Sequence, residues 1–459
     1  MKNSDILKIE RLAKKYDETN IPLYLSYPVE RWWKTPSDQE LFIEHFQKLP
    51  SYFFYFHFPF CESNCYFCSC YKYVTTDTTK NDIYLEHLEK EFEHKITALG
   101  LAHSFPITQM HWGGGTPTFL SEQQIERFHK VISRHFEIGI DEPERHISVE
   151  SYPDESLNME KLKLLRGMGF NEISFGIQDF NSSVQKAINR NNPVDIVRKK
   201  VEDSKSHGFR AHVDLCYGLP FQGLGEFEQT LKEVVRINPD RIILYPYAHY
   251  PMSFPAQRLI PTMSLPNSFI KILQSIQAEE ILVANGYVRV GYDHYVKPEN
   301  SLFKGYRENK GVRNFMGSAI EPGKLLGFGN SAISFSGKMY FHNLISLDGY
   351  YETVNRQVIP VEPKMGHLLS RDDLIRHKVI QKYIMCDFQI NKEEINQELQ
   401  INFDEYFQPE LKRLQALEKD GLVEFEGSRM IRVTSLGKPF VRHIAFVFDA
   451  YYSNGESEN

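Results

Sequence analysis

Residues 61–70 read CESNCYFCSC and hold four of the six cysteines in this 459-residue chain. They follow YFFYFHFPF, residues 52–60, an aromatic run that predicts a buried strand entering a loop. Thiols crowded in this way serve as disulfides, as zinc ligands or as iron–sulfur ligands. Ligands and clusters in parallel α/β folds lie beyond the carboxyl ends of the strands, so a cofactor is expected at this loop.

The rest of the chain argues against the first two uses. The N-terminal MKNSDILKIERLAKKYDE lacks the apolar core of a secretory signal, and no apolar run approaches the roughly 20 residues that cross a bilayer. We therefore expect a cytoplasmic protein, in which a disulfide framework is rare. Structural zinc sites take two ligands from a second, distant pair, and none follows at the usual distance. Three thiols on one tight loop can instead hold three corners of a [4Fe–4S] cluster; here they are Cys61, Cys65 and Cys68.

The amino-acid composition and net charge limit the classes of protein and partner to be considered. Hydrophobic residues make up 41% of the chain and charged residues 25%, which is typical of a globular protein. The formal net charge of −7 gives no indication of a nucleic-acid-binding surface. The length suffices for a large core with one or two smaller domains, and we expect neither a nucleic acid nor a membrane as partner.

Strand-like and helix-like segments alternate after the loop. This order predicts βαβ units and a mostly parallel sheet. With residues 52–58 the count reaches six strands by about residue 248, which favours an α/β fold with an incomplete barrel. The later predicted strands are ITQMHW (107–112), RHISVE (145–150), NEISFGIQ (171–178), RAHVDLCYG (210–218) and RIILYPYA (241–248).

The last half of the chain divides in two. Residues 250–345 are expected to be loop-rich, and residues 309–335 within them are dense in Gly and small residues. From about Ser370 the pattern is helical, and residues 419–448 predict a helix, a hairpin and a helix. We interpret this part as a winged-helix-like module that covers a substrate or packs on the barrel.

The cysteine loop resembles the signature of the radical S-adenosylmethionine (SAM) enzymes, because C-x3-C-x2-C spacing occurs together with an aromatic residue, Phe67, before the third cysteine. The resemblance implies a [4Fe–4S] cluster whose fourth iron is left for SAM. Reduction of the cluster then cleaves SAM to a 5′-deoxyadenosyl radical.

Further segments are similar to those of one family, the oxygen-independent coproporphyrinogen III dehydrogenases (oxidases). They include CESNCYFCSC, QMHWGGGTPTFL, GFNEISFGIQDFN, VDLCYGLP and DHYVKPE, and the similarity runs from residue 26 to residue 452. The resemblance implies an incomplete (β/α)6 radical SAM barrel with a mainly α C-terminal domain. It also implies oxidative decarboxylation of two propionates of coproporphyrinogen III to vinyls, which gives protoporphyrinogen IX in heme biosynthesis.

The same resemblance implies the organisation and the partners. Residues 1–50 would be an arm over the active site, 51–250 the partial barrel, 251–365 its extension with a second SAM and substrate region, and 366–459 a helical lid. The cofactors would be the cluster and two SAM molecules. The partners would be a tetrapyrrole substrate and a reductant protein such as flavodoxin, and we expect a monomer.

Single residues acquire roles by resemblance. Tyr55 and Cys70 would act in catalysis, Tyr55 beside the cluster and the sulfonium, and Cys70 as a nearby thiol that does not ligate. Taken singly, each implied side chain could equally be a packing or hydrogen-bonding group of the core. The implied contacts to the first SAM are Tyr55, Phe67, Gly114, Gly115, Thr116, Glu150, Gln178, Arg190 and Asp214, and those to the second are Ala248, Phe315 and Ile333.

Three segments depart from the family pattern. The family's Pro-Arg-Tyr-Thr-Ser-Tyr-Pro is here PLYLSYP, with Leu23 and Leu25 at the Arg and Thr positions. Its Asn-Phe-Gln-Gly-Tyr is here NFMGS, with Met316 and Ser318, and the Val-Asp after Glu150 is here Ser-Tyr.

These departures fit a divergent paralogue and leave two alternatives open. One is a related radical SAM enzyme that transfers a methyl group or forms a cyclopropane. The other is a heme-binding carrier of the same fold, against which Cys70 counts.

Overall fold

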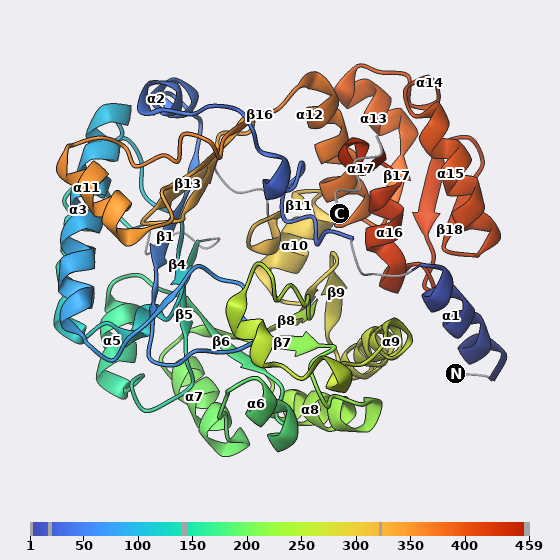
Figure 1. Cartoon of the computed structure of the whole chain (residues 1–459), viewed down its shortest axis with the longest axis horizontal. Coiled ribbons are helices and arrows are strands. Elements are labelled where there is room, and N and C mark those ends of the chain that lie inside the picture. The colour runs from blue at the N-terminus through green and yellow to red at the C-terminus, as the bar shows by residue number, and fades with distance from the viewer. Residues whose placement is uncertain (1–2, 17–20, 139–144, 321–323, 454–459) are drawn as a thin grey trace.

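The computed structural model describes residues 3–16, 21–138, 145–320 and 324–453. Twelve strands form one sheet in the order β16-β15-β14-β13-β1-β4-β5-β6-β7-β8-β10-β9. The seven central strands run parallel: β13 (Lys324–Phe328), β1 (Tyr52–Phe58), β4 (Gln109–Gly114), β5 (His146–Ser151), β6 (Glu172–Gln178), β7 (Arg210–Tyr217) and β8 (Arg241–Pro246). The sheet curves without closing, so the predicted α/β fold with an incomplete barrel is confirmed (Figure 1).

Antiparallel strands extend the sheet at both ends, and four short ladders lie outside it. One end adds β10 (His294–Val296) and β9 (Val288–Val290), and the other adds β14 (Ile333–Phe335), β15 (Met339–His342) and β16 (His367–Leu368). The remaining strands are β2 (Phe60–Cys61), β3 (Tyr73–Val74), β11 (Gly311–Asn314), β12 (Gly317–Ile320), β17 (Gln389–Asn391), β18 (Val423–Glu426) and β19 (Met430–Val433).

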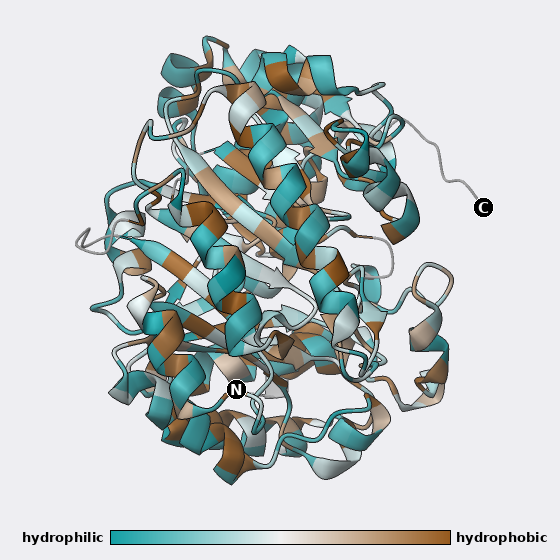
Figure 2. Ribbon diagram, turned by 90° about the vertical axis from the view of Figure 1, so that its left-hand side faces the viewer, coloured by the Kyte–Doolittle hydropathy of each residue, from teal (hydrophilic) through white to brown (hydrophobic). Residues whose placement is uncertain are grey.

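Helices cover the convex side of the sheet (Figure 1). In Figure 2 the surface helices turn hydrophilic stripes outward, as amphipathic helices on a sheet must. Those that accompany the barrel and its extension are α1 (Asn3–Lys15), α2 (Gln39–Phe46), α3 (Thr79–Leu99), α4 (Glu122–Ser133), α5 (Met159–Gly167), α6 (Ser182–Ala187), α7 (Val194–Ser206), α8 (Leu224–Ile237), α9 (Ser268–Ala284), α10 (Ser301–Arg307) and α11 (Leu347–Asn355).

Side chains along the parallel strands alternate between two environments. In β1, Phe54 and Phe56 are fully buried among the helices, where their rings pack on Phe328 at 5.9 and 4.9 Å between centroids. The intervening Tyr55 and His57 point to the opposite side and line a cavity. Because successive side chains of a strand face opposite ways, each parallel strand contributes one apolar row to the core and one row to the cavity.

Residues 250–345, expected to be loop-rich, hold more regular structure than that expectation implies. This stretch contains the 17-residue helix α9 and the strands β9 to β15. The seventh parallel strand, β13, also lies here and pairs with β1, with Leu326 opposite Phe54. The five residues of β13 lie in a Gly-rich stretch, where no sequence pattern predicts a strand. They pair with a strand some 270 positions earlier in the chain, and nothing in the neighbouring sequence indicates that pairing.

The C-terminal part is helical with a small sheet, as predicted. The strands β17, β19 and β18 form an antiparallel sheet, in which β18 and β19 make the predicted hairpin. Residues of this part share a core with α1, which places Ile9 and Leu12 against it. Its helices are α12 (Arg371–His377), a π-helical turn at Lys378–Ile384, α13 (Lys392–Leu399), α14 (Phe403–Tyr406), α15 (Gln408–Lys419), α16 (Val441–Phe446) and α17 (Ala450–Ser453).

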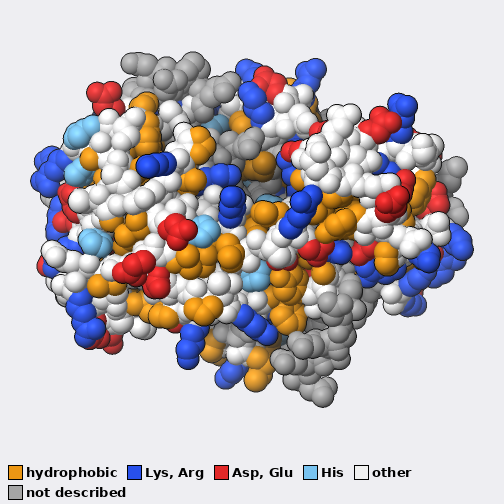
Figure 3. Space-filling view, turned by 90° about the horizontal axis from the view of Figure 1, so that it is seen from above, with side chains coloured by type: hydrophobic (Ala, Val, Ile, Leu, Met, Phe, Trp, Pro, Cys, Tyr) orange, Lys and Arg blue, Asp and Glu red, His pale blue; other side chains and the backbone are white. Residues whose placement is uncertain are grey.

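The surface shows mixed charge. On the face seen in Figure 3, acidic and basic side chains are interspersed among hydrophobic ones. Among the described residues, no helix has both the length and the apolar character needed to cross a membrane.

A buried ion pair joins α3 to β13 and α11. Lys95 Nζ lies 2.7 Å from Glu91 Oε1, and both side chains have no exposed surface. Lys95 also donates to the Gly327 carbonyl at 2.7 Å, and Glu91 accepts from Gly329 N and Tyr350 Oη, each at 2.7 Å. Every charge is therefore compensated, and removal of one partner would leave an unpaired buried ion.

We predict that Lys95→Ala lowers the free energy of unfolding by about 3–5 kcal/mol, because Glu91 then stays buried without its counter-ion. Urea denaturation followed by circular dichroism measures the change. The matched control is Lys90→Ala on the same helix, since Lys90 contacts Glu86 and Asn355 at the exposed surface. The cost of this substitution should stay below about 1 kcal/mol. Equal effects of the two substitutions would contradict the role given to the buried pair.

Candidate functional site

The cysteine loop follows β1 directly and joins β2 to β3. All six cysteines of the chain are free thiols, and Cys65 is buried whereas Cys61 and Cys68 are partly exposed. Each of the three thiols has a donor nearby. Thr116 Oγ1 lies 3.6 Å from Cys61 Sγ, Arg190 Nη1 lies 3.3 Å from Cys65 Sγ, and Cys70 N lies 3.4 Å from Cys68 Sγ.

Iron binds the thiolate form of cysteine. Hydrogen bonding from Cys70 and the charge of Lys72 lower the pKa of Cys68 to about 6, despite its burial. Burial raises the pKa of Cys61 to about 11. The three thiols on one loop, with Arg190 and Lys72 beside them, fit an iron–sulfur cluster, which supplies the positive charge that a buried thiolate needs.

The glycine turn lies against this loop because β4 ends beside β1. Gly115 N donates to Phe58 O at 2.7 Å, and Thr116 N donates to Phe60 O at 2.9 Å. Gly114 has φ +104°, and a Cβ there would come 2.3 Å from His57 Nδ1. Only glycine combines this conformation with this approach, so the backbone itself forms the wall of the cavity.

A chain of polar contacts runs from the turn into the barrel. Glu150, near the end of β5, accepts from Gly114 N at 3.2 Å and lies 3.0 Å from His111 Nε2. The His111 ring stacks on Tyr55 at 5.9 Å between centroids, and Tyr55 Oη lies 3.1 Å from His57 Nδ1. Burial lowers the pKa of His57 to about 4, so the imidazole is neutral at physiological pH.

The opposite wall carries Gln178, Arg190 and Asp214. The register of β6 shifts between Gly176 and Gln178, and Gln178 has φ 69°, a left-handed conformation that few non-glycine residues adopt. Such local strain is typical of functional sites. Gln178 Oε1 accepts from Tyr245 Oη at 2.8 Å.

Arg190 and Asp214 are held by different contacts. The Arg190 guanidinium lies over the Tyr152 ring, 4.3 Å from its centroid, and also donates to Gly176 O. Ser174 Oγ donates to Asp214 Oδ1 at 2.9 Å. Burial, with the nearby charge of Glu150, raises the pKa of Asp214 to about 7.

The residues expected at a second SAM lie on another side of the same cavity. Phe315 packs edge-on against Trp33 and Tyr340, at 6.2 and 6.1 Å, and Ile333 joins the same cluster. Gln257 Nε2 donates to both Ala248 O and Phe67 O at 3.2 Å, so it links this region to the cysteine loop.

Two of the segments that depart from the family pattern meet at one buried pair. Arg313 Nη1 lies 2.6 Å from Asp293 Oδ2, and its other nitrogens donate to the carbonyls of Leu23 and Tyr24. Ser318 Oγ donates to Asp293 Oδ1 at 2.8 Å. The third departure, Tyr152, is the ring beneath Arg190.

One cavity of about 770 Å³ is lined by residues from each of these regions. Sequence reasoning missed His57, His111, Ser174 and Tyr245, which all line the cavity. His57 lies two positions from Tyr55 on β1 and Ser174 four positions from Gln178 on β6, so the strand period was a signal for these two. Every site residue expected from the sequence lines the cavity: Tyr55, Cys61, Cys65, Phe67, Cys68, Cys70, Gly114, Gly115, Thr116, Glu150, Gln178, Arg190, Asp214, Ala248, Phe315 and Ile333.

Comparison with known proteins finds two domain families and full-length relatives. Residues 55–234 match the Radical SAM superfamily, and residues 369–440 match the HemN C-terminal domain. The chain is 37% identical to the oxygen-independent coproporphyrinogen III oxidases of Escherichia coli and Synechocystis sp., over 96% of this chain and 94% and 95% of theirs.

A solved structure of a relative has the same fold as this chain. Coproporphyrinogen III oxidase from Escherichia coli, described as a radical SAM enzyme, superposes with a TM-score of 0.86 at 35% identity, over 96% of this chain and 98% of that one. The radical SAM family implies a [4Fe–4S] cluster and SAM as cofactors.

We predict that Gly114→Ala abolishes SAM binding, because the new Cβ collides with His57 and disfavours the backbone conformation of the turn. Equilibrium dialysis of labelled SAM with the anaerobically reconstituted protein measures the loss. Gly225→Ala in α8 is the matched control, since a Cβ there meets nothing within 4 Å. Unchanged SAM affinity in Gly114→Ala would contradict the close approach at this turn.

A second prediction concerns pH and the protein without cofactors. The pKa of Asp214 is raised from 3.8 to about 7, so between these values the folded state binds the proton more tightly than the unfolded state. The stabilisation from the protonated carboxyl is full below about pH 4 and is lost as the pH rises towards 7, with a slope of up to about 1.4 kcal/mol per pH unit.

Asp214→Asn should therefore flatten the pH dependence of the unfolding free energy in this window, as measured by urea denaturation at several pH values. Asp195→Asn is the control, because the Asp195 side chain is 90% exposed. Identical pH profiles for wild type and Asp214→Asn would refute the raised pKa.

Proposed function

Because this chain belongs to the oxygen-independent coproporphyrinogen III oxidase family of radical SAM proteins, we propose that it converts two propionates of coproporphyrinogen III to vinyls in heme biosynthesis. The product is protoporphyrinogen IX. The observation that carries the proposal is the single cavity onto which the cysteine loop, the glycine turn and the polar residues of β5 to β7 all open.

The residues have distinct tasks in this proposal. Cys61, Cys65 and Cys68 hold the cluster, with Phe67 packed beside it. Gly114, Gly115 and Thr116 present backbone groups and a hydroxyl to the methionine part of SAM, where the absence of Cβ atoms permits close approach. When bound, the cluster and SAM together supply a 5′-deoxyadenosyl radical.

The polar wall orients the first SAM. Glu150 and Asp214 offer carboxylates to its ammonium and ribose groups, and Gln178 offers an amide. Arg190 offers a guanidinium to its carboxylate, since a planar fork matches that group. Tyr55 lies between His57 and His111, where it fixes the cavity wall next to the sulfonium.

A second SAM is part of the proposal, with Ala248, Phe315 and Ile333 against it. Phe315 and Ile333 supply apolar surface, and Ala248 supplies a small residue beside the Gln257 link. Met316 and Ser318 stand where the family has Gln and Tyr, and Met316 lines the cavity. Methyl transfer from a second SAM to another substrate is the alternative that this change favours.

Each propionate would lose a β-hydrogen atom, carbon dioxide and one electron. The hydrogen atom ends in deoxyadenosine, and the electron passes to an acceptor. Cys70 is the exposed thiol of the loop and lies next to Cys68, where it acts near the cluster without ligating it.

The wider setting completes the proposal. We propose that the protein works as a cytoplasmic monomer and receives electrons from a small reductant protein such as flavodoxin. Residues 1–50 form an arm over the site, 51–250 the partial barrel, 251–365 its extension and 366–459 the lid; Leu23 and Leu25 of the arm line the cavity.

The test is an anaerobic assay. The reconstituted, reduced protein is incubated with SAM and coproporphyrinogen III, and the products are analysed by mass spectrometry. We expect loss of two carbon dioxide molecules per tetrapyrrole with two deoxyadenosines formed. Cys68→Ala should reduce both products to background because the cluster loses a ligand, whereas Cys386→Ala, remote from the loop in sequence and absent from the cavity wall, should retain them.

Other products would point elsewhere. Methylthioadenosine or a methylated compound without decarboxylation would contradict the proposal and favour methyl transfer. Tight, stoichiometric heme binding without SAM cleavage would favour a carrier.

A further inference from the structure

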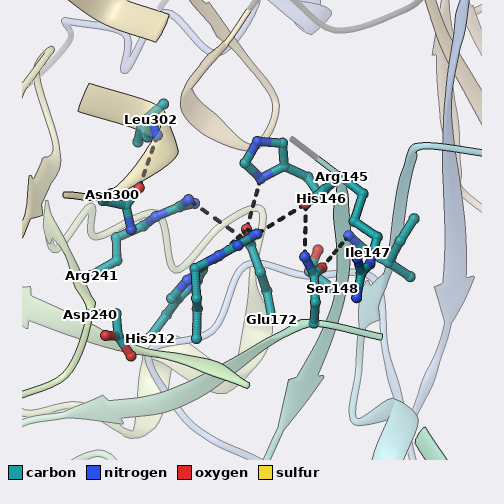
Figure 4. Close-up of polar contacts among 12 residues, drawn as sticks. Arg145, His146, Ile147, Ser148, Glu172, His212, Asp240, Arg241, Asn300 and Leu302 are labelled. Carbon is teal, nitrogen blue, oxygen red and sulfur yellow. Dashed lines mark hydrogen bonds and ion pairs between the residues drawn. The ribbon is translucent and has the colours of Figure 1, made fainter. Parts of the chain in front are cut away.

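A cluster of charged and polar side chains lies near the amino ends of the parallel strands (Figure 4). These strand ends form the floor of the cavity, away from the cysteine loop, which follows the carboxyl end of β1. His146 opens β5, Glu172 opens β6 and Arg241 opens β8, while His212 is the third residue of β7. All four side chains line the cavity. None of them belongs to the sites proposed above for the cluster and SAM.

The two oxygens of Glu172 have different surroundings. Oε1 lies 2.7 Å from His146 Nδ1 and 2.6 Å from Arg210 Nη2. Oε2 lies 3.6 Å from Arg241 Nη2 and 3.7 Å from His212 Nε2, both beyond hydrogen-bond distance. One side of the carboxylate is therefore satisfied, and the side facing Arg241 and His212 is loosely packed.

Arg241 makes no hydrogen bond through its side chain to any residue that the structure describes. Its side chain is 12% exposed, and its Nε is buried without a partner. The neighbouring Asp240 does not serve it, because one Asp240 oxygen accepts from Ala211 N at 2.9 Å and the other lies 3.5 Å from Lys205 Nζ. His212 Nε2 and His146 Nε2 are likewise buried and unpartnered.

Arg241 has acidic groups around it but none in hydrogen-bond contact, since Glu172, Asp214 and Asp240 act on it only through their charge. The pKa of Glu172 is held well below its usual value by His146 and Arg241 despite burial. A guanidinium carries five N–H donors, and burying it without acceptors is costly. The N–H donors of Arg241 are thus available to an anion that can accept hydrogen bonds.

We infer that Arg241, with His212 beside it, is a carboxylate-binding subsite at the floor of the cavity. Its planar fork matches a carboxylate with two parallel hydrogen bonds. This inference rests on the proposed function, since the natural ligand there is a propionate of the tetrapyrrole. The amino-acid carboxylate of a bound SAM is the other source of the same chemistry.

The position suits a substrate carboxylate. His212 lies two residues before Asp214 on β7, which is roughly 7 Å along the strand. The floor therefore lies one layer below the residues proposed to hold SAM. A tetrapyrrole placed between the two layers can extend one propionate to Arg241 while another lies near the radical.

The experiment measures binding, so that it does not depend on turnover. The dissociation constant of coproporphyrinogen III is determined by anaerobic equilibrium dialysis for wild type, Arg241→Gln and Arg241→Lys, and that of labelled SAM is determined separately. Arg236→Gln is the matched control, because the Arg236 side chain is 65% exposed on α8. Thermal melting and the cluster absorption check that each variant is folded and loaded.

We expect Arg241→Gln to weaken coproporphyrinogen binding about tenfold or more, with Arg241→Lys intermediate and Arg236→Gln unchanged. If SAM binding weakens instead, the carboxylate comes from SAM. If neither constant changes, the subsite is refuted and Arg241 is only a counter-ion of Glu172.

A second measurement changes the bound molecule instead of the protein, so that it remains informative even if the variants are less stable. Wild type should bind the tetra-amide of the porphyrinogen more weakly than the tetra-acid, and this preference should shrink in Arg241→Gln, since the partner of the carboxylate is gone. An equal preference in both proteins overturns the inference. Absence of decarboxylation by wild type would refute the proposed function alone, because the binding constants report on the floor independently.

Discussion

The structure depends on the two-residue period of its parallel strands. One face of each strand must be apolar because helices cover it, and residues such as Phe56, Trp112 and Ile173 are fully buried there. The opposite face of each strand can therefore carry polar side chains. Because the sheet is curved, the polar side chains of all the parallel strands point toward one cavity. A register slip of one residue would exchange the two rows, so the core and the site are specified together.

The positions of the site residues are also fixed because the loops that carry them are attached to the ends of strands. The cysteine loop and the glycine turn each follow a strand directly, and Arg190 follows the short helix α6 that comes after β6. These segments remain anchored to the strand ends by hydrogen bonds. Gly115 N and Thr116 N bond back to the β1 end, and Arg190 bonds to Gly176 of β6. Loops anchored in this way can hold thiols and backbone donors at fixed positions without their own hydrophobic core.

These constraints explain what the sequence alone could reveal. The six early strands are long, apolar and separated by amphipathic helices, so their order and the incomplete barrel are predictable. The three cysteines proposed to hold the cluster can be picked out from the sequence because Cys61, Cys65 and Cys68 lie within eight residues of each other. Strand β13 cannot, since the pairing of Lys324–Phe328 with β1 is a long-range choice. The charged cluster of the floor could not be predicted, because each of its members lies on a different strand. Glu172 is on β6, His212 on β7 and Arg241 on β8, and they meet only because the sheet is curved.

The cavity is electrostatically polarised along the strands. Glu150 and Asp214 lie toward the carboxyl ends, where Arg190 is engaged with Cys65 and Gly176. Arg241 and His212 lie toward the amino ends, where Glu172 is near them but beyond hydrogen-bond distance. In the proposed arrangement, the carboxyl end of the strands would favour the cationic groups of SAM, and the floor would favour a substrate carboxylate. Because burial strengthens both interactions, this gradient would orient ligands of opposite charge within one cavity before any chemistry begins.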